Sequence, residues 1–274
     1  MISRFNSIRN SLLAMIQLFI ARGVSGRERI HVLDIGASSI VKPRVALAYS
    51  AIEVVAFDPD PRACEDFSKL DFDVDFYPYA VAGCNGLRTL YLTRKSHCSS
   101  LLKPLPTRDL RYQVEKEIAV KCRTLNSLNI HADIIKIDVQ GAELEILQEA
   151  NITLMNSHAV ELEVWFDKKY TGQARLEDIH EFMINLGFES AGFSSLYFDG
   201  RLDNNSISFA DILYLRSGDT LHGQKVVLVS LIDSSLDFLI SKYVVNSIAG
   251  YKDRFLILLI RLIGSLKSVG PRFH

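Results

Sequence analysis

Three aspartates end hydrophobic segments that are typical of β-strands. Asp34 ends the segment IHVLD, Asp58 ends EVVAFD and Asp138 ends DIIKID. The carboxyl ends of parallel strands meet at one edge of a sheet, and α/β proteins bind their ligands at that edge. Asp58 lies 22 residues after Gly36, about the spacing at which a carboxylate accepts hydrogen bonds from ribose hydroxyls. Together these residues predict a site for a cofactor that contains a nucleoside.

The turn after the first strand narrows the choice of cofactor. Its sequence, DIGASSI, contains one glycine. A dinucleotide site uses G-x-G-x-x-G to seat a pyrophosphate against backbone N–H groups. A cofactor without phosphates, such as S-adenosylmethionine, needs a close turn and an acid instead. The turn therefore favours S-adenosylmethionine, with a nicotinamide-dependent enzyme of similar topology as the less favoured alternative.

The rest of the chain alternates short strands with helical segments, which is the pattern of a parallel sheet covered by helices. We expect strands at 30–34, 53–58, 74–77, 87–92, 118–122, 133–138, 159–165, 188–193 and 209–216. We expect helices at 42–49, 61–70, 142–150 and 176–186. The prediction is an α/β fold with a Rossmann-like, mostly parallel sheet. Helices cover both of its faces, and its last strand is antiparallel.

Charge is distributed unevenly along the 274 residues. The net charge of −1 combines +4 over 1–29, +5 over 242–274 and −10 between them. The acidic middle argues against a nucleic-acid partner. The hydrophobic content of 48% excludes an extensively disordered chain. The four cysteines form no C-x-x-C pair and have no histidine at ligand spacing, so we expect no metal site, no disulfides and a reducing cytoplasm.

Both ends of the chain are predicted to form basic amphipathic helices, because apolar residues recur at helical spacing over 2–21 and 243–266. We therefore divide the chain into an N-terminal extension at 1–29, a central domain at 30–217 and a C-terminal extension at 218–274. The extensions either pack on the acidic domain or form a homodimer interface. The alternative is peripheral attachment to the inner face of the membrane. No segment is long and apolar enough to predict a spanning helix.

The motifs together resemble those of FkbM-type, class I S-adenosylmethionine-dependent methyltransferases. The resemblance runs from about residue 32 to 216 and rests on DIGA, AFDPDP, TLNSL, KIDVQGAE and ELE. It implies a class I methyltransferase sheet and S-adenosylmethionine as the cofactor. It also implies the cofactor contacts: Asp34, Gly36 and Ala37 at the methionine end, Asp58 at the ribose, and Tyr79, Ala80 and Val81 at the adenine.

The same resemblance places Asp138 opposite the methyl group that is transferred. A hydroxyl acceptor benefits from a base within hydrogen-bond reach, and Asp138, Glu143 and His97 are the candidates. Glu143 alternatively serves as a first-turn acid that favours the helix dipole, and His97 as a solvated loop residue. Glu163, on the strand that follows, either meets the substrate or a metal, or is a buried structural acid. Trp165 either stacks on a sugar or packs in the core.

The predicted activity is O-methylation of a hydroxyl on a sugar, a surface glycan or a secondary metabolite. A small molecule or a glycan is therefore the expected substrate. The main alternative is a relative that binds the cofactor without turnover, because Ser38, Ser39 and Ile40 depart from the usual first turn of the family.

Overall fold

A computed structural model describes residues 29–37, 52–63, 74–198 and 207–216. Both predicted terminal helices and the predicted helix at 42–49 lie outside the described residues. So does most of the helix expected at 61–70, of which residues 61–63 are helical. None of the helices described is long and apolar enough to cross a membrane.

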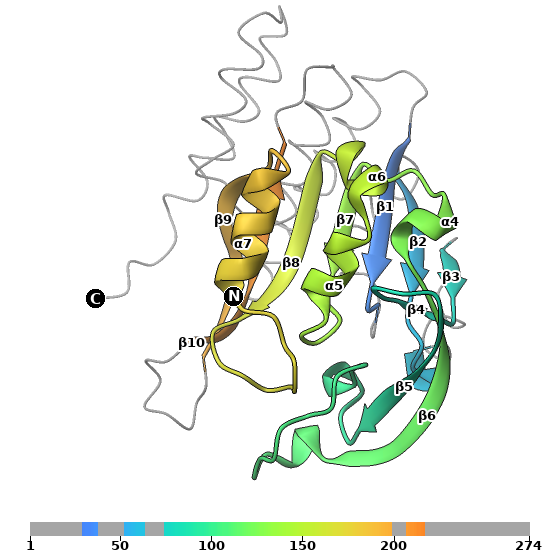
Figure 1. The fold of residues 1–274 in the computed structure, drawn as a ribbon, viewed down its shortest axis with the longest axis vertical. Helices are drawn as coiled ribbons and strands as arrows, with labels where there is room; N and C mark the ends of the chain where they lie inside the picture. Colours follow the sequence, from blue (N-terminus) through green and yellow to red (C-terminus); the bar gives the residue numbers. More distant parts are fainter. Residues whose placement is uncertain (1–28, 38–51, 64–73, 199–206, 217–274) are drawn as a thin grey trace, which may run out of the picture.

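The main layer is a seven-stranded sheet (Figure 1). In spatial order its strands are β3 (Asp75–Tyr77), β2 (Ile52–Phe57), β1 (Ile30–Ile35), β7 (Ile134–Ile137), β8 (Ala159–Trp165), β10 (Ile207–Leu215) and β9 (Glu189–Phe198). Neighbouring strands from β3 to β8 run parallel, whereas β10 is antiparallel to β8 and β9. The strand order is that of a class I methyltransferase sheet. The prediction that the last strand is antiparallel is confirmed.

Hydrophobic side chains from the sheet and its helices form one large core. On β7, Ile135 and Ile137 are fully buried and pack in the same cluster as Ile146 and Leu147 of the following helix. Lys136 projects from the other face of β7, because successive side chains of a strand alternate between the two faces. Burial of isoleucine on one face thus fixes the register that places Lys136 beside the aspartates at the sheet edge.

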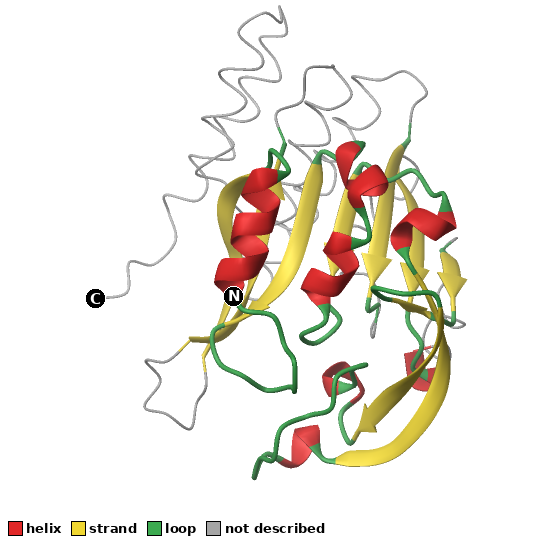
Figure 2. Cartoon of the chain, in the orientation of Figure 1, coloured by secondary structure: helices red, strands yellow, loops and turns green. Residues whose placement is uncertain are grey.

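The described helices cover one face of the sheet (Figures 1 and 2). They are α4 (Leu125–Leu128), α5 (Glu143–Gln148), α6 (Asn151–Met155) and α7 (Leu176–Asn185). The sequence predicted α5 and α7 but not α4 or α6. Those two helices have four and five residues, too few for a helical period to stand out. The segments expected to cover the opposite face lie mostly outside the described residues.

A second, three-stranded sheet lies beyond the carboxyl ends of the central strands (Figure 1). It consists of β4 (Ala80–Val81), β6 (Val114–Arg123) and β5 (Gly86–Thr93). The hairpin expected from the sequence is confirmed, since β5 and β6 pair antiparallel. The connection between them contains two 3₁₀ turns, η2 (Ser96–Cys98) and η3 (Leu110–Tyr112). This connection therefore lies where a ligand of the main sheet would bind.

Candidate active site

The turn after β1 brings three strands together. Gly36 has φ of +81°, and the N–H groups of Gly36 and Ala37 both donate to the carbonyl oxygen of Phe57, at 2.9 and 3.1 Å. A Cβ atom on Gly36 would lie 1.8 Å from the carbonyl oxygen of Asp138. Only glycine fits here, because both the backbone conformation and the approach of Asp138 exclude a side chain.

The two acids after β2 have different partners. Asp58 accepts a hydrogen bond from the backbone N–H of Asp60 at 2.7 Å. The Asp60 carboxylate forms a bidentate pair with Arg62, at 2.9 and 2.6 Å, and lies 3.3 Å from Ser99 Oγ. Arg62 also donates to the carbonyl oxygen of Thr93 at 2.9 Å. The Asp60–Arg62 pair therefore ties the end of β2 to the connection after β5.

The surroundings of Asp58 shift the pKa of its carboxyl group. Burial raises its pKa to about 7, although the hydrogen bond from Asp60 opposes the shift. The negative charges of Asp60, Asp34 and Asp138 raise the pKa further. A ligand that carries positive charge or donates hydrogen bonds would stabilise the ionised carboxyl group, so this environment is suited to ligand binding.

The turn after β7 holds Asp138 against the neighbouring strands. Its backbone N–H donates to the carbonyl oxygen of Ile35 at 2.9 Å. Gln140, with φ of +61°, donates through Nε2 to Asp138 at 2.8 Å and to Glu163 at 2.7 Å. The hydroxyl oxygen of Tyr170 lies 3.1 Å from Gln140 Oε1, which orients the amide. Gln140 thus links the carboxyl groups at the ends of β7 and β8.

Glu143 and Glu163 are both buried. Burial raises the pKa of Glu143 to about 7, against hydrogen bonds from the backbone. Burial also raises the pKa of Glu163 well above its usual value, as do the charges of Asp138 and Glu143. Glu143 Oε1 accepts from the N–H of Gly141 at 2.9 Å and lies 3.3 Å from that of Val139. Glu143 therefore shapes the turn that carries Asp138.

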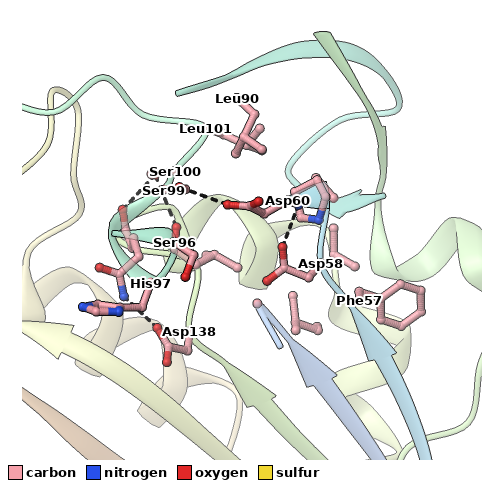
Figure 3. A pocket seen from close by; sticks show the side chains of 17 residues that line it. Phe57, Asp58, Asp60, Leu90, Ser96, His97, Ser99, Ser100, Leu101 and Asp138 are labelled. Carbon is pink, nitrogen blue, oxygen red and sulfur yellow. Dashed lines mark hydrogen bonds between the residues drawn. The ribbon is translucent and has the colours of Figure 1, made fainter. Parts of the chain in front are cut away.

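These turns surround a cavity that is partly open to solvent (Figure 3). Its lining comprises Ile35, Gly36, Phe57, Asp58, Pro59, Asp60, Ala80, Val81, Leu90, Ser96, His97, Ser99, Ser100, Leu101, Asp138, Val139 and Gln140. In Figure 3, Asp58 and Asp60 lie on one side of the cavity, and His97 and Asp138 on the other.

The cavity brings together six of the predicted site residues. They are Gly36, Asp58, Ala80, Val81, His97 and Asp138. The other four lie next to it and do not line it: Asp34, Ala37, Tyr79 and Glu143. For Glu143, the turn-shaping position differs from the catalytic contact that we expected. Tyr79 packs against Phe57 and Tyr77, with ring centroids 5.4 and 5.7 Å apart.

Asp34 is held by Lys136, whose Nζ lies 3.4 Å from Asp34 and 3.6 Å from Asp138. Burial alone would lower the pKa of Lys136, but the negative charges of Asp34 and Asp138 outweigh it and raise the pKa above its usual value. The lysine is therefore charged and offsets part of the negative charge at this edge.

Sequence reasoning missed Asp60, Ser99, Ser100 and Gln140. The Ser100 hydroxyl donates to the carbonyl oxygen of Gln140 at 2.9 Å, across 40 residues of chain. The repeat of aspartate and proline in AFDPDP was the one signal that pointed to Asp60. No local pattern relates the serines to β7, because their contacts depend on how the connection between β5 and β6 folds back.

Comparison with known proteins identifies the family. The profile of the FkbM methyltransferase domain matches residues 34–193. The match covers more than half of the chain, so the protein belongs to the FkbM methyltransferase family. It is an S-adenosylmethionine-dependent methyltransferase, and the nicotinamide alternative is set aside. A search of curated protein sequences finds no match to this chain.

Solved structures similar to this chain are also methyltransferases. Magnesium protoporphyrin IX methyltransferase from Synechocystis PCC 6803, with bound S-adenosylmethionine, is 12% identical, with a TM-score of 0.41, over 76% of this chain and 79% of the other. A putative tRNA (m1A22) methyltransferase from Streptococcus pneumoniae, in complex with S-adenosyl-L-methionine, is 11% identical, with a TM-score of 0.39, over 92% and 96%. Our assignment rests on the family match and on the strand order of the chain itself.

The residues of the cavity fit S-adenosylmethionine. Asp58 offers a buried carboxyl group to the two ribose hydroxyls, which are hydrogen-bond donors. Ala80, Val81 and Leu90 supply apolar surface for an adenine ring. Asp58, Asp60 and Asp138 give the edge acidic character that suits a sulfonium and an ammonium group. The cavity is therefore chemically matched to the cofactor that the family uses.

Proposed function

We propose that this protein transfers a methyl group from S-adenosylmethionine to a hydroxyl group of a sugar, a surface glycan or a secondary metabolite. The bound cofactor supplies a methyl group on a positively charged sulfur. Transfer is an in-line displacement, so the protein has to orient the acceptor oxygen and take up its proton. The observation that carries the proposal is that Asp138 and His97 lie together on the cavity wall across from Asp58.

Asp138 is the first candidate to bind the acceptor hydroxyl. One of its oxygens accepts from Gln140, and Lys136 lies 3.6 Å from the other. These contacts hold the carboxylate at the end of β7. A carboxylate in that position orients a hydroxyl group by accepting its hydrogen bond, and positioning of this kind supplies much of the rate of a displacement.

His97 is the candidate base. Burial lowers its pKa, as do the positive charges of Arg111 and Lys95. The imidazole is therefore neutral at physiological pH and has a nitrogen that can accept a proton. His97 is exposed at the wall of the cavity, so a role in deprotonating the acceptor stands beside the solvated loop position that we gave as the alternative.

Two candidate residues of β8 do not line the cavity. Glu163 and Trp165 are two residues apart, so their side chains project from the same face of the strand. Both are buried, and Glu163 accepts a hydrogen bond from Gln140. Trp165 packs with Cys98, Tyr112 and Tyr170 in a buried cluster, which agrees with the core position that we gave as the alternative to stacking on a sugar. The proposal therefore uses no acceptor contact from β8.

The proposal is tested with the full chain, S-adenosylmethionine labelled in its methyl group, and a panel of monosaccharides, oligosaccharides and phenolic metabolites. We expect label to be transferred to oxygen of one acceptor class. Transfer to nitrogen or carbon acceptors alone would contradict the proposal. Cofactor binding without transfer to any acceptor would favour the relative without turnover.

A further inference from the structure

A second group of ionisable residues lies at the opposite edge of the sheet, where β1 and β7 begin. His31 is the second residue of β1, and Asp133 directly precedes β7. Their main chains are neighbours, because Asp133 N–H donates to the His31 carbonyl oxygen at 2.9 Å. His131 lies two residues before Asp133. The four residue steps of β1 from His31 to Ile35 separate this group from the cavity edge by about 13 Å.

Both imidazoles are directed at the same carboxyl group. His31 Nδ1 lies 3.3 Å from Asp133 Oδ2, and His131 Nε2 lies 3.3 Å from Asp133 Oδ1. One potential ligand atom from each residue falls within 4.8 Å of the other two. The two rings meet edge to face, with centroids 5.1 Å apart. Two nitrogens and a carboxylate therefore converge on one small volume.

This geometry is compatible with a metal centre as well as with hydrogen bonds. A tetrahedral zinc ion with bonds of about 2.0–2.1 Å holds its ligand atoms roughly 3.3–3.4 Å apart. The nitrogen-to-oxygen separations of 3.3 Å are close to that spacing, with each histidine facing a different oxygen of Asp133, and the contact of His31 Nδ1 is also a long hydrogen bond. The Asp133 side chain is 1% exposed, whereas His31 and His131 are 38% and 54% exposed. A buried anionic ligand is thus reached from solvent through two imidazoles.

Groups around the three residues hold them in place. Asp133 Oδ2 accepts the backbone N–H of His31 at 2.8 Å. Glu53 Oε2 lies 3.9 Å from His31 Nε2, the ring nitrogen that faces away from Asp133. This separation is longer than a hydrogen bond, so Glu53 places a negative charge near the His31 ring without fixing its tautomer.

We propose that His31, His131 and Asp133 bind a divalent transition-metal ion, with zinc as the best match to two imidazoles and one carboxylate. The ion joins the start of β1 to the segment that leads into β7. Its distance from the cavity makes it a structural ion that takes no part in methyl transfer. Our sequence prediction of no metal site considered only local spacing, and His31 is 100 residues away from His131.

The test uses the full chain after treatment with a chelator and dialysis. Titration with Zn²⁺ is followed by calorimetry, and titration with Co²⁺ by visible absorption, which reports the coordination geometry. The test variants are His31→Gln and His131→Gln, both at partly exposed positions that preserve folding. The matched control is His180→Gln, an exposed histidine on α7. We expect one bound ion in the native chain and in the control.

Each test variant should weaken the affinity for Zn²⁺ by at least about 10-fold and abolish the visible absorption of bound Co²⁺. Equal affinity in the native chain and both variants would overturn the proposal, as would no binding at all. The affinity for S-adenosylmethionine, measured on the same samples, should not change. A chain that fails to bind Zn²⁺ would therefore leave the proposed methyltransferase function unaffected, because binding of S-adenosylmethionine is measured separately.

Discussion

The two ends of β1 and β7 show contrasting ways of placing charge on the same pair of strands. At the carboxyl ends, the chain turns through positive φ at Gly36 and Gln140, and buried carboxyl groups face one another. At the amino ends, reciprocal hydrogen bonds join His31 and Asp133, and the buried carboxylate faces two imidazoles. Backbone strain and mutual repulsion of acids are concentrated at the carboxyl edge.

That difference explains which end carries the chemistry. Strained turns and like charges destabilise the free protein, and a cationic, hydrogen-bonding ligand reduces the repulsion between the carboxyl groups. At the amino edge, the Asp133 carboxylate already has two imidazoles within 3.3 Å, and the cavity lies at the opposite edge. The predictions below change one edge at a time.

The largest effect is expected from Gly36→Ala. The new methyl group would overlap the Asp138 carbonyl oxygen, so we expect the free energy of unfolding to fall by roughly 3 kcal/mol or more. Gly172→Ala is the matched control, because Gly172 has φ of +79° but nothing within 4 Å of an added Cβ. It should cost about 1–2 kcal/mol. If chemical denaturation shows that both variants lose the same free energy of unfolding, the close contact with the Asp138 carbonyl oxygen does not constrain the turn.

The next effect is on turnover. Asp138→Ala should lower kcat by about 10²- to 10⁴-fold, because the acceptor hydroxyl loses the group that orients it. S-adenosylmethionine should still bind, since Asp58 and the adenine surface are unchanged. Steady-state kinetics and calorimetry on the same sample separate the two quantities. Turnover close to that of the native enzyme would remove Asp138 from the chemistry.

A smaller effect is expected from His97→Gln, about 10- to 100-fold in kcat. Because the pKa of His97 is lowered, its neutral form is present near neutral pH and is lost only at a pH below the ordinary histidine value of about 6.5. The native enzyme should lose activity on the acidic side of its pH profile, and the variant should not. His180→Gln should retain the native profile. An unchanged acidic limb in His97→Gln would exclude the imidazole as the base.

The carboxyl edge shows what the sequence could predict and what it could not. Asp58 and Asp138 follow their strands as expected, because the strand pattern and the aspartates are both local signals. Asp34 lies inside β1 rather than at its end, and its contact with Lys136 depends on the register of β1 with β7. That register is set by burial across the whole sheet, which short-range periodicity does not contain.

The remaining site residues depend on the second sheet. β4 has two residues, too few to give an alternating pattern, yet both line the cavity. Ser99 and Ser100 reach Asp60 and Gln140 only because the connection between β5 and β6 crosses the cavity. The histidines near Asp133 were missed for the same reason. Long-range contacts of this kind become visible only when the strands are paired.

The central claim is that the cavity at the carboxyl edge binds S-adenosylmethionine through Asp58, and calorimetry at pH 6 and pH 8 tests it most directly. The raised pKa of about 7 means that Asp58 gains its charge over this interval. In the free protein the pKa of Asp58 is higher than in the unfolded chain. The free energy of unfolding therefore falls as pH rises from about 4 to about 7. Bound cofactor compensates, because the ionised carboxyl group accepts both ribose hydroxyls.

We therefore predict that the affinity of the native chain increases from pH 6 to pH 8. Asp58→Asn should bind about 10- to 100-fold more weakly at pH 8, because it loses hydrogen bonds to a charged acceptor, and its affinity should not respond to pH. Glu143→Gln is the control for the other carboxyl group with a pKa of about 7, and it should keep the pH response. An Asp58→Asn variant with native affinity and a native pH response would contradict the account.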